Sequence, residues 1–138
     1  MRQFQTRLAI ATHGQRLYEF TDEVAAWLAG EGVVEGLVTQ FCRHTSASLL
    51  VNENAAPAVQ RDLLRWLAQA VPEGAAYEHD DEGPDDMPAH IRTMLTGASL
   101  SVPVAGGRML LGTWQGLYLA EHRRAPHRRE VVAHFIGD

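Results

Sequence analysis

Three short segments hold most of the side chains that can carry chemistry. The first, His44–Glu53, combines an imidazole, three hydroxyls, an amide and a carboxylate. On an extended strand, His44, Ser46 and Ser48 share one face. That face either borders a pocket or faces solvent as an ordinary polar strand, and the periodicity does not decide between the two.

The second segment, His79–His90, carries two histidines with acidic residues between them. If Asp86 caps a helix, His90 lies one turn later on the same side. Imidazole and carboxylate together can bind a divalent metal such as Zn²⁺ or Mg²⁺, although the spacings HxxxH and HExxH are absent. The segment is therefore either a metal site or a solvated acidic loop.

The third segment runs from Gly112 to Glu121. Glycine within a strand often marks a bulge or the close approach of a ligand. Trp114 could stack on a planar ligand whose edge Gln115 hydrogen-bonds, whereas the alternative for Trp114 is core packing. Glu121 ends the segment and precedes a basic stretch, where an isolated salt bridge would be its ordinary role.

That basic stretch, His122–Arg129, complements an acidic one, Glu78–Asp86. Strand patterns on both sides predict that His122–Arg129 is a mobile hairpin loop. Arginine pairs well with phosphate oxygens, so Arg124, Arg128 and Arg129 are candidate phosphate ligands. A solvated turn is the alternative, since exposed charge runs are usually just that.

Length and composition frame these candidates. The chain has 138 residues, enough for one domain (1–138) with its own core. The net charge of −5 argues against a nucleic-acid binder, and no apolar run is long enough to cross a membrane. Cys42 is the single cysteine, which excludes an internal disulfide and favours the cytoplasm, and we expect it buried in a strand. We see no secretory signal at the N-terminus.

Hydrophobic periodicity, together with glycine, proline and helix-capping residues, predicts the helices and strands that position these residues. Thr21 is a candidate N-cap for a helix that ends at Gly30–Gly32, and Pro57 begins a second helix that Pro72 stops. A third helix begins near Asp86 and ends at Gly97. Gly106–Gly107 predicts a hairpin turn. The predicted strands are Phe4–Ala11, Val33–Cys42, Leu49–Val51, Ser99–Val104, Arg108–Gly112, Gly116–Glu121 and Val131–Ile136. Because strands outnumber helices and occur in runs, we expect an α+β fold.

Taken together, the segments resemble the YjbQ-like family, described as secondary thiamine-phosphate synthases. The residues that carry the resemblance are HTSASLLVNEN (His44–Asn54), YEHDDEGPDDMPAH (Tyr77–His90), TGASLSVPVAGGRMLLGTWQGLYLAEH (Thr96–His122) and RREVVAHFIG. The match covers nearly the whole chain, and HTSASL followed by LGTWQ is highly specific. Many members have a further histidine where this chain has Pro88.

The resemblance implies a β-sandwich-like core of mixed or antiparallel strands with flanking helices, and a homotrimer with clefts near the subunit contacts. It also implies a weak activity that joins a pyrimidine diphosphate to a thiazole phosphate and releases pyrophosphate. The pocket residues carried over are His44, Ser46, Asn52, Glu53, His79, Asp86, His90, Trp114, Gln115 and Glu121. A metal site on His44, His79 and His90 survives the change at Pro88.

Three hypotheses remain for the function. The first is a transferase acting on phosphorylated heterocycles, in which a metal or arginines neutralise the leaving pyrophosphate. The second is a non-catalytic trimer that binds a metal or a phosphorylated metabolite. The third is a metal-dependent hydrolase, because three histidines with an open position are a catalytic zinc pattern. All three predict a polar pocket around His44 and His90.

Overall fold

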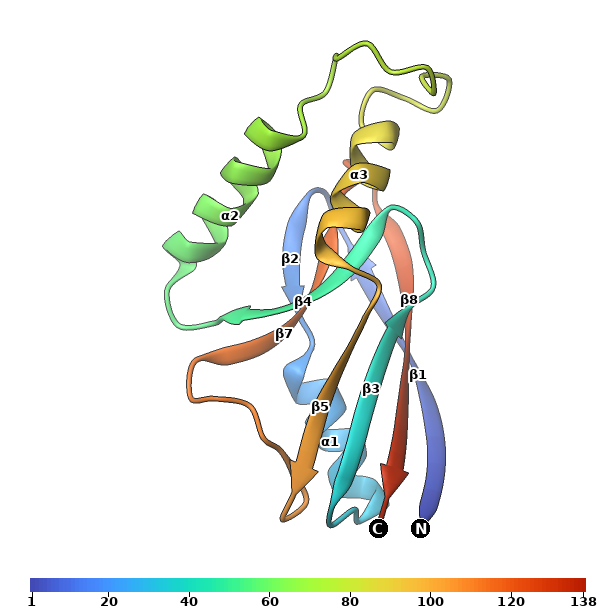
Figure 1. Ribbon diagram of the computed structural model, residues 1–138, viewed down its shortest axis with the longest axis vertical. Helices are drawn as coiled ribbons and strands as arrows, with labels where there is room; N and C mark the ends of the chain where they lie inside the picture. The colour runs from blue at the N-terminus through green and yellow to red at the C-terminus, as the bar shows by residue number, and fades with distance from the viewer.

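Strands dominate the chain, and every pair of neighbouring strands is antiparallel (Figure 1). A computed structural model describes residues 1–138. The elements in chain order are β1 (Arg2–Thr12), β2 (Arg16–Glu19), α1 (Thr21–Glu31), β3 (Gly36–Cys42), β4 (Ala47–Glu53), α2 (Pro57–Ala70), α3 (Asp86–Thr96), β5 (Ser99–Ala105), β6 (Arg108–Met109), β7 (Gln115–Glu121) and β8 (His127–Gly137).

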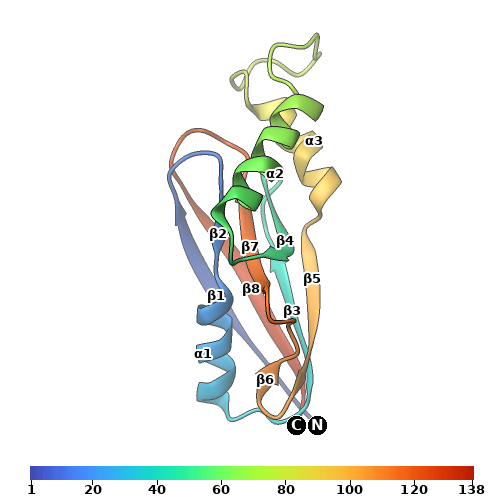
Figure 2. The same cartoon turned by 90° about the vertical axis from the view of Figure 1, so that its left-hand side faces the viewer.

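The strands form two sheets. Sheet A has the order β1-β8-β3-β5-β6, and sheet B has the order β2-β7-β4. Helices α2 and α3, with the long loop between them, extend beyond one end of the sheets, and both chain termini lie at the other end (Figures 1 and 2). The predicted α+β class with a β-sandwich-like core and flanking helices is confirmed.

A single hydrophobic core lies between the sheets and against α1. Alternation along β3 shows how the sequence builds it: Val38 and Cys42 are buried, whereas Leu37 and Phe41 point outward and are exposed. The buried free thiol of Cys42 confirms the prediction for that residue. The cluster comprises Phe20, Val24, Leu28, Val33, Val38, Cys42, Ala47, Leu49, Val102, Val104, Leu117, Leu119, Val131 and Phe135.

Both predicted helix caps on α1 and α3 are wrong in detail. Thr21 is the first helical residue instead of the N-cap, and its hydroxyl donates to Glu19 Oε2 while accepting from the Leu117 amide. Asp85 occupies the N-cap of α3, which frees the carboxylate of Asp86 for other partners. The predicted Gly106–Gly107 turn is confirmed, with φ of 59° and 77° at the two glycines.

The strand prediction misses β2 and extends the strand at Arg108 too far. It also assumes a hairpin between the last two strands, and this is wrong. β7 pairs with β2 and β4 in sheet B, whereas β8 pairs with β1 and β3 in sheet A. The segment between them therefore crosses from one sheet to the other. None of the helices is long and apolar enough to span a bilayer.

Candidate metal centre

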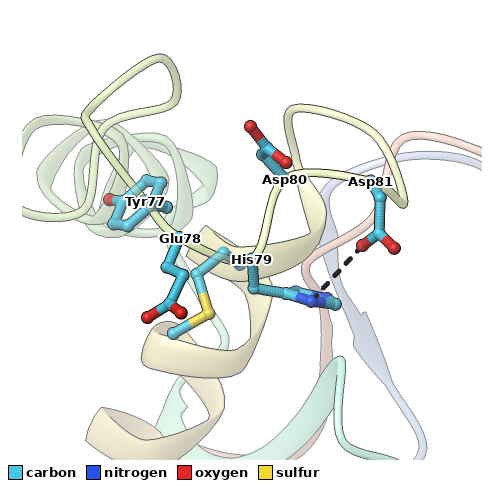
Figure 3. Close-up of a pocket in the computed structure, with 6 residues that line it drawn as sticks. Tyr77, Glu78, His79, Asp80 and Asp81 are labelled. Carbon is cyan, nitrogen blue, oxygen red and sulfur yellow. Dashed lines mark ion pairs between the residues drawn. The ribbon is translucent and has the colours of Figure 1, made fainter.

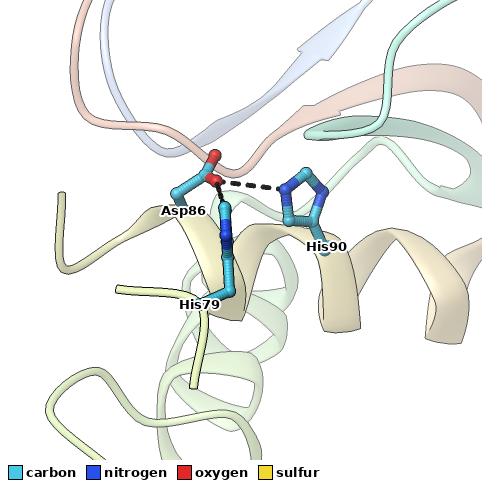
Figure 4. A group of neighbouring side chains, drawn as sticks. All are labelled: His79, Asp86 and His90. Atoms are coloured by element: carbon cyan, nitrogen blue, oxygen red, sulfur yellow. Dashed lines mark hydrogen bonds and ion pairs between the residues drawn. The ribbon is translucent and has the colours of Figure 1, made fainter. Parts of the chain in front are cut away.

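Two histidines and one carboxylate converge at the N-terminal end of α3 (Figure 4). Asp86 and His90 are four residues apart on this helix, so they lie on the same face. His79 comes from the loop before the helix. The Asp86 Oδ2 atom lies 2.7 Å from His79 Nε2 and 3.1 Å from His90 Nε2. One ligand atom from each of the three residues lies within 4.8 Å of the others, which makes the group a candidate metal site.

The contact between His90 Nε2 and Asp86 Oδ2 has no hydrogen to share when the His90 ring is neutral. His90 Nδ1 lies 2.8 Å from the carbonyl oxygen of Thr45, which can only accept, so Nδ1 carries the hydrogen. On a neutral ring the Nε2 atom is then an acceptor, and it faces the acceptor oxygen of Asp86. A second proton or a cation is needed between the two. A backbone carbonyl that fixes the tautomer in this way is the usual second shell of a metal-binding histidine.

Neighbouring charges and hydrogen bonds keep the Asp86 carboxylate ionised. The Arg123 Nη1 atom donates to the other oxygen of Asp86, Oδ1, over 2.6 Å. Burial by itself would raise the pKa of Asp86, but hydrogen bonds and charges from His79, His90 and Arg123 outweigh it and lower the pKa. The hydrogen bond to Asp86 in turn raises the pKa of His79. Asp86 therefore offers a carboxylate oxygen to the two imidazoles.

Open space lies on both sides of the group. On one side is a cleft of about 600 Å³ lined by Tyr77, Glu78, His79, Asp80, Asp81 and Met87 (Figure 3). On the other is a pocket of about 680 Å³ to which both His44 and His90 contribute. Its remaining lining is Phe41, Cys42, Arg43, Thr45, Thr93, Met94 and Ala98. The predicted pocket around His44 and His90 exists, although its walls are more apolar than expected.

His44 does not belong to the group of ligands. Its Nε2 atom accepts a hydrogen bond from the Glu130 backbone amide over 2.8 Å, and burial together with the charge of Arg129 lowers its pKa. The predicted set of His44, His79 and His90 is therefore corrected to His79, Asp86 and His90. The physical reason is that the segment before β4 turns His44 toward β8 instead of toward α3.

The basic stretch is held by acids and does not form a free phosphate-binding loop. Arg123 pairs with Asp85 and Asp86, and Arg124 pairs with Glu73. His127 and the residues that follow already belong to β8. Of the three predicted phosphate ligands, Arg124 is engaged by Glu73, Arg129 is buried, and Arg128 remains exposed on β8.

Glu121 and Ser46 belong to a buried network around Arg129. Glu121 Oε1 accepts from Arg129 Nε over 2.8 Å and from the Thr12 hydroxyl over 2.6 Å, while Oε2 accepts from Arg129 Nη2 over 2.5 Å. Arg129 Nη2 also donates to Ser46 Oγ over 2.9 Å. Ser48 is buried as well and bonds His122. The serines thus face the protein interior, which neither alternative for this strand anticipated.

The remaining predicted site residues lie elsewhere. Gln115 and Glu121 stand at opposite ends of β7, about 20 Å apart for a strand of this length. Trp114 is 63% exposed, so it does not pack in the core, and it lines neither of the two pockets beside His79 and His90. Asn52 Oδ1 accepts from the Glu53 amide, and Glu53 Oε2 accepts from the amides of Ala55 and Ala56 just before α2.

Sequence reasoning missed two contributors to the site, Arg123 as the partner of Asp86 and the carbonyl of Thr45. For Arg123 a signal existed, because the acidic and basic stretches of one small domain carry opposite charges and so attract each other. For the carbonyl of Thr45 no residue type could give a signal, since every residue carries one.

Comparison with known proteins assigns the chain to a family. The model of the family described as UPF0047 protein YjbQ-like matches residues 6–138. A UPF0047 protein of Synechocystis sp. is 52% identical over 138 residues, covering 99% of this chain and 94% of the relative. The UPF0047 protein YjbQ of Salmonella typhimurium is 43% identical over 136 residues, covering 98% and 99%.

Solved structures show the same fold. A crystal structure of an uncharacterised YjbQ/UPF0047 family protein from Clostridium acetobutylicum has a TM-score of 0.89 at 34% identity, covering 95% of this chain and 99% of that one. A conserved hypothetical protein from Thermus thermophilus has a TM-score of 0.85 at 36% identity, covering 95% and 99%. These names state no activity.

Proposed function

This chain belongs to the YjbQ-like UPF0047 family, whose matched relatives carry no stated activity. We propose that it is a divalent-metal-dependent transferase that acts weakly on phosphorylated heterocycles, joining a pyrimidine diphosphate to a thiazole phosphate with release of pyrophosphate. Its own site supports the metal dependence, and the substrates follow from the family resemblance alone. The observation that carries the metal dependence is the contact between His90 Nε2 and Asp86 Oδ2, which needs a cation or a proton.

The residues present fit a divalent cation. Two imidazoles and one carboxylate with an open position are the donor set of catalytic zinc sites. Two ligands of a tetrahedral zinc with bonds of about 2.0–2.1 Å are about 3.3 Å apart. The observed separations of 2.7 and 3.1 Å are about 0.6 and 0.2 Å shorter than this, so the side chains would have to move apart slightly to admit the cation.

Each residue then has a distinct task. Asp86 and His90 would hold the cation from α3, and His79 would hold it from the preceding loop. Arg123 fixes the orientation of the Asp86 carboxylate, and the Thr45 carbonyl fixes the ring of His90. When bound, a divalent cation would supply charge neutralisation for the leaving pyrophosphate. The neighbouring pocket with Phe41 and Met94 offers apolar surface for the heterocycle.

Two other functions stay in view. A metal-dependent hydrolase is favoured by the three protein ligands and the open position, which is where a zinc enzyme holds its water. A non-catalytic metal-binding protein would need the same residues but no pocket beside them. The pocket that His90 shares with His44 supports an enzyme.

The assembly and location are proposals as well. The outward side chains of Leu37 and Phe41, 39% and 50% exposed, leave apolar surface on sheet A that a closed homotrimer would cover. Light scattering at micromolar concentration tests this, and a monomeric mass would exclude it. The free thiol of Cys42 supports a cytoplasmic location.

Metal content and turnover test the proposed function together. The purified protein should bind one Zn²⁺ or Mg²⁺ per chain, and His90→Ala should weaken this binding at least tenfold. Arg128→Ala, on the exposed side of β8, should leave it unchanged. Pyrophosphate release from the two substrates should require the metal. Metal binding with hydrolysis of the diphosphate alone would favour the hydrolase, and metal binding with no turnover would favour the binding protein. If the protein binds no divalent metal, the metal-dependent transferase, the hydrolase and the metal-binding protein are all excluded.

A further inference from the structure

A second possible ligand stands beside His79 on the loop that precedes α3. Glu82 Oε2 lies 3.0 Å from His79 Nε2, the same nitrogen that lies 2.7 Å from Asp86 Oδ2. His79, Asp81 and Glu82 thus form a second group of potential ligands, and it overlaps the group of His79, Asp86 and His90 at His79. The two groups share His79 without merging, so the Glu82 carboxylate has to turn toward Asp86 to join the first.

The backbone of Glu82 is held in place while its side chain is free. Arg123 Nη2 donates to the carbonyl oxygen of Glu82 over 2.9 Å, and Nη1 of the same guanidinium donates to Asp86 Oδ1 over 2.6 Å. One planar group therefore fixes the main chain of Glu82 relative to Asp86. The side chain of Glu82 is 64% exposed, so its rotation toward the cation displaces no packed neighbour.

The two acidic neighbours of His79 approach different nitrogens of its ring. Asp81 Oδ1 lies 3.5 Å from Nδ1, as the dashed line in Figure 3 shows, whereas Asp86 contacts the other ring nitrogen, Nε2. Glu82 approaches Nε2, the nitrogen that faces Asp86 and His90. Asp80 points away from His79 in the same view. Only Glu82 among these acids is thus on the ligand side.

We propose that Glu82 is a displaceable fourth ligand of the cation that His79, Asp86 and His90 hold, an inference that rests on the metal site of the proposed function. Three protein ligands leave one position of a tetrahedral cation open. An exposed carboxylate on a loop fills that position in the absence of substrate and yields it to a phosphate oxygen. Glu82 thereby tunes both the retention of the metal and the affinity for phosphorylated ligands.

The experiment compares Glu82→Gln with Asp80→Asn, which removes the same charge from the same loop. Each protein is titrated with Co²⁺, whose visible absorption reports ligand number, and the Co²⁺-loaded protein is then titrated with inorganic phosphate. Glu82→Gln should weaken Co²⁺ binding about tenfold. It should also strengthen phosphate binding to the loaded protein several-fold, because phosphate no longer competes with a carboxylate. Asp80→Asn should change neither by more than about twofold, since the Asp80 side chain is exposed to solvent and points away from His79.

The opposite signs of the two changes separate a ligand from a merely structural residue, whose loss would weaken both bindings. If Glu82→Gln matches the wild type in both titrations, or if both variants lose Co²⁺ equally, the inference is overturned while the three-residue site stands. A wild-type protein that binds no Co²⁺ overturns the proposed function itself. Thermal melts of the metal-free proteins confirm that both variants fold.

Discussion

Replacing Arg129 by alanine should destabilise the protein strongly, because it leaves the buried carboxylate of Glu121 without its ion-pair partner. Glu121 is 1% exposed and receives two hydrogen bonds from Arg129, leaving only those from the Thr12 hydroxyl and the Arg123 amide. Removing one partner of a buried ion pair costs about 3–5 kcal/mol. For a chain of this length, we expect a fall in Tm of about 10–15 °C.

The loss should depend on pH with a definite sign. Burial alone would raise the pKa of Glu121, but the hydrogen bonds of Arg129 and Thr12 lower it below its ordinary value of 4.5. In the wild type this carboxylate therefore stabilises the fold above pH 4.5, and the contribution disappears as the pH falls through the lowered pKa. In Arg129→Ala burial dominates, so the stranded carboxylate takes up a proton at higher pH. The difference between variant and wild type should thus be largest near pH 7.5 and smaller at pH 5.

Urea unfolding at fixed protein concentration, followed by far-UV circular dichroism at both pH values, measures these free energies. Arg128→Ala is the matched control, since it removes the neighbouring exposed arginine and should change stability by no more than about 0.5 kcal/mol. The double variant Glu121→Gln with Arg129→Met should recover part of the loss, because no charge is then left buried. Equal and small effects of Arg128→Ala and Arg129→Ala, below about 1 kcal/mol, would refute the reasoning.

Three further outcomes are expected. Burial, reinforced by the charge of Arg92, lowers the pKa of His122 from 6.5 to about 4, so its contribution to stability should be complete above pH 6.5 and decline toward pH 4. Urea titrations measure the free energy of unfolding across that range. In the His122→Asn variant, this free energy should decline by about 2–4 kcal/mol less than in the wild type. A Cβ at Gly36 would lie 2.3 Å from the Ile136 carbonyl oxygen, whereas none of the neighbours of Gly30 lies within 4 Å. By thermal melting, Gly36→Ala should therefore lower Tm, and Gly30→Ala in α1 should stabilise by about 0.5–1 kcal/mol. The hydrogen bond to Asp86 raises the pKa of His79, so protons should begin to compete with Zn²⁺ near neutral pH. Calorimetric Zn²⁺ affinity should thus fall from pH 7.5 to pH 6, and an unchanged affinity would count against His79 as a ligand.

The sequence predicted the elements well where one local rule controls them. Pro57 begins α2 and Gly32 ends α1 in the left-handed conformation, as their backbone preferences require. The cap of α3 at Asp86 was predicted wrongly because a second acid, Asp85, stood one residue earlier and the carboxylate of Asp86 had stronger partners in Arg123 and the histidines. Local capping rules cannot anticipate such distant partners.

The site was half predictable for the same reason. His90 and Asp86 follow from helical spacing, and their segment was identified. His44 contacts the Glu130 amide and not α3, because sheet A places β8 beside β3. This strand pairing joins segments that are far apart in the sequence, so local patterns cannot predict it. Arg129 illustrates the limit most clearly: in a row of exposed-looking arginines, only the alternation of β8 separates the buried one from its neighbour Arg128. That alternation could not be used while the segment was taken for a loop.

The place of β8 between β1 and β3 sets the order in which the fold can be completed. Sheet A takes the order β1-β8-β3, and Thr12 pairs with His127 across more than a hundred residues of intervening chain. During synthesis, β1 and β3 emerge early but have no central strand to join them. Closing so long a loop is costly in entropy and slow. β3 can pair with β5 before β8 is made, but the β1-β8-β3 part of sheet A forms late. Until β8 arrives, the facing edges of β1 and β3 remain unpaired, which exposes the nascent chain to aggregation.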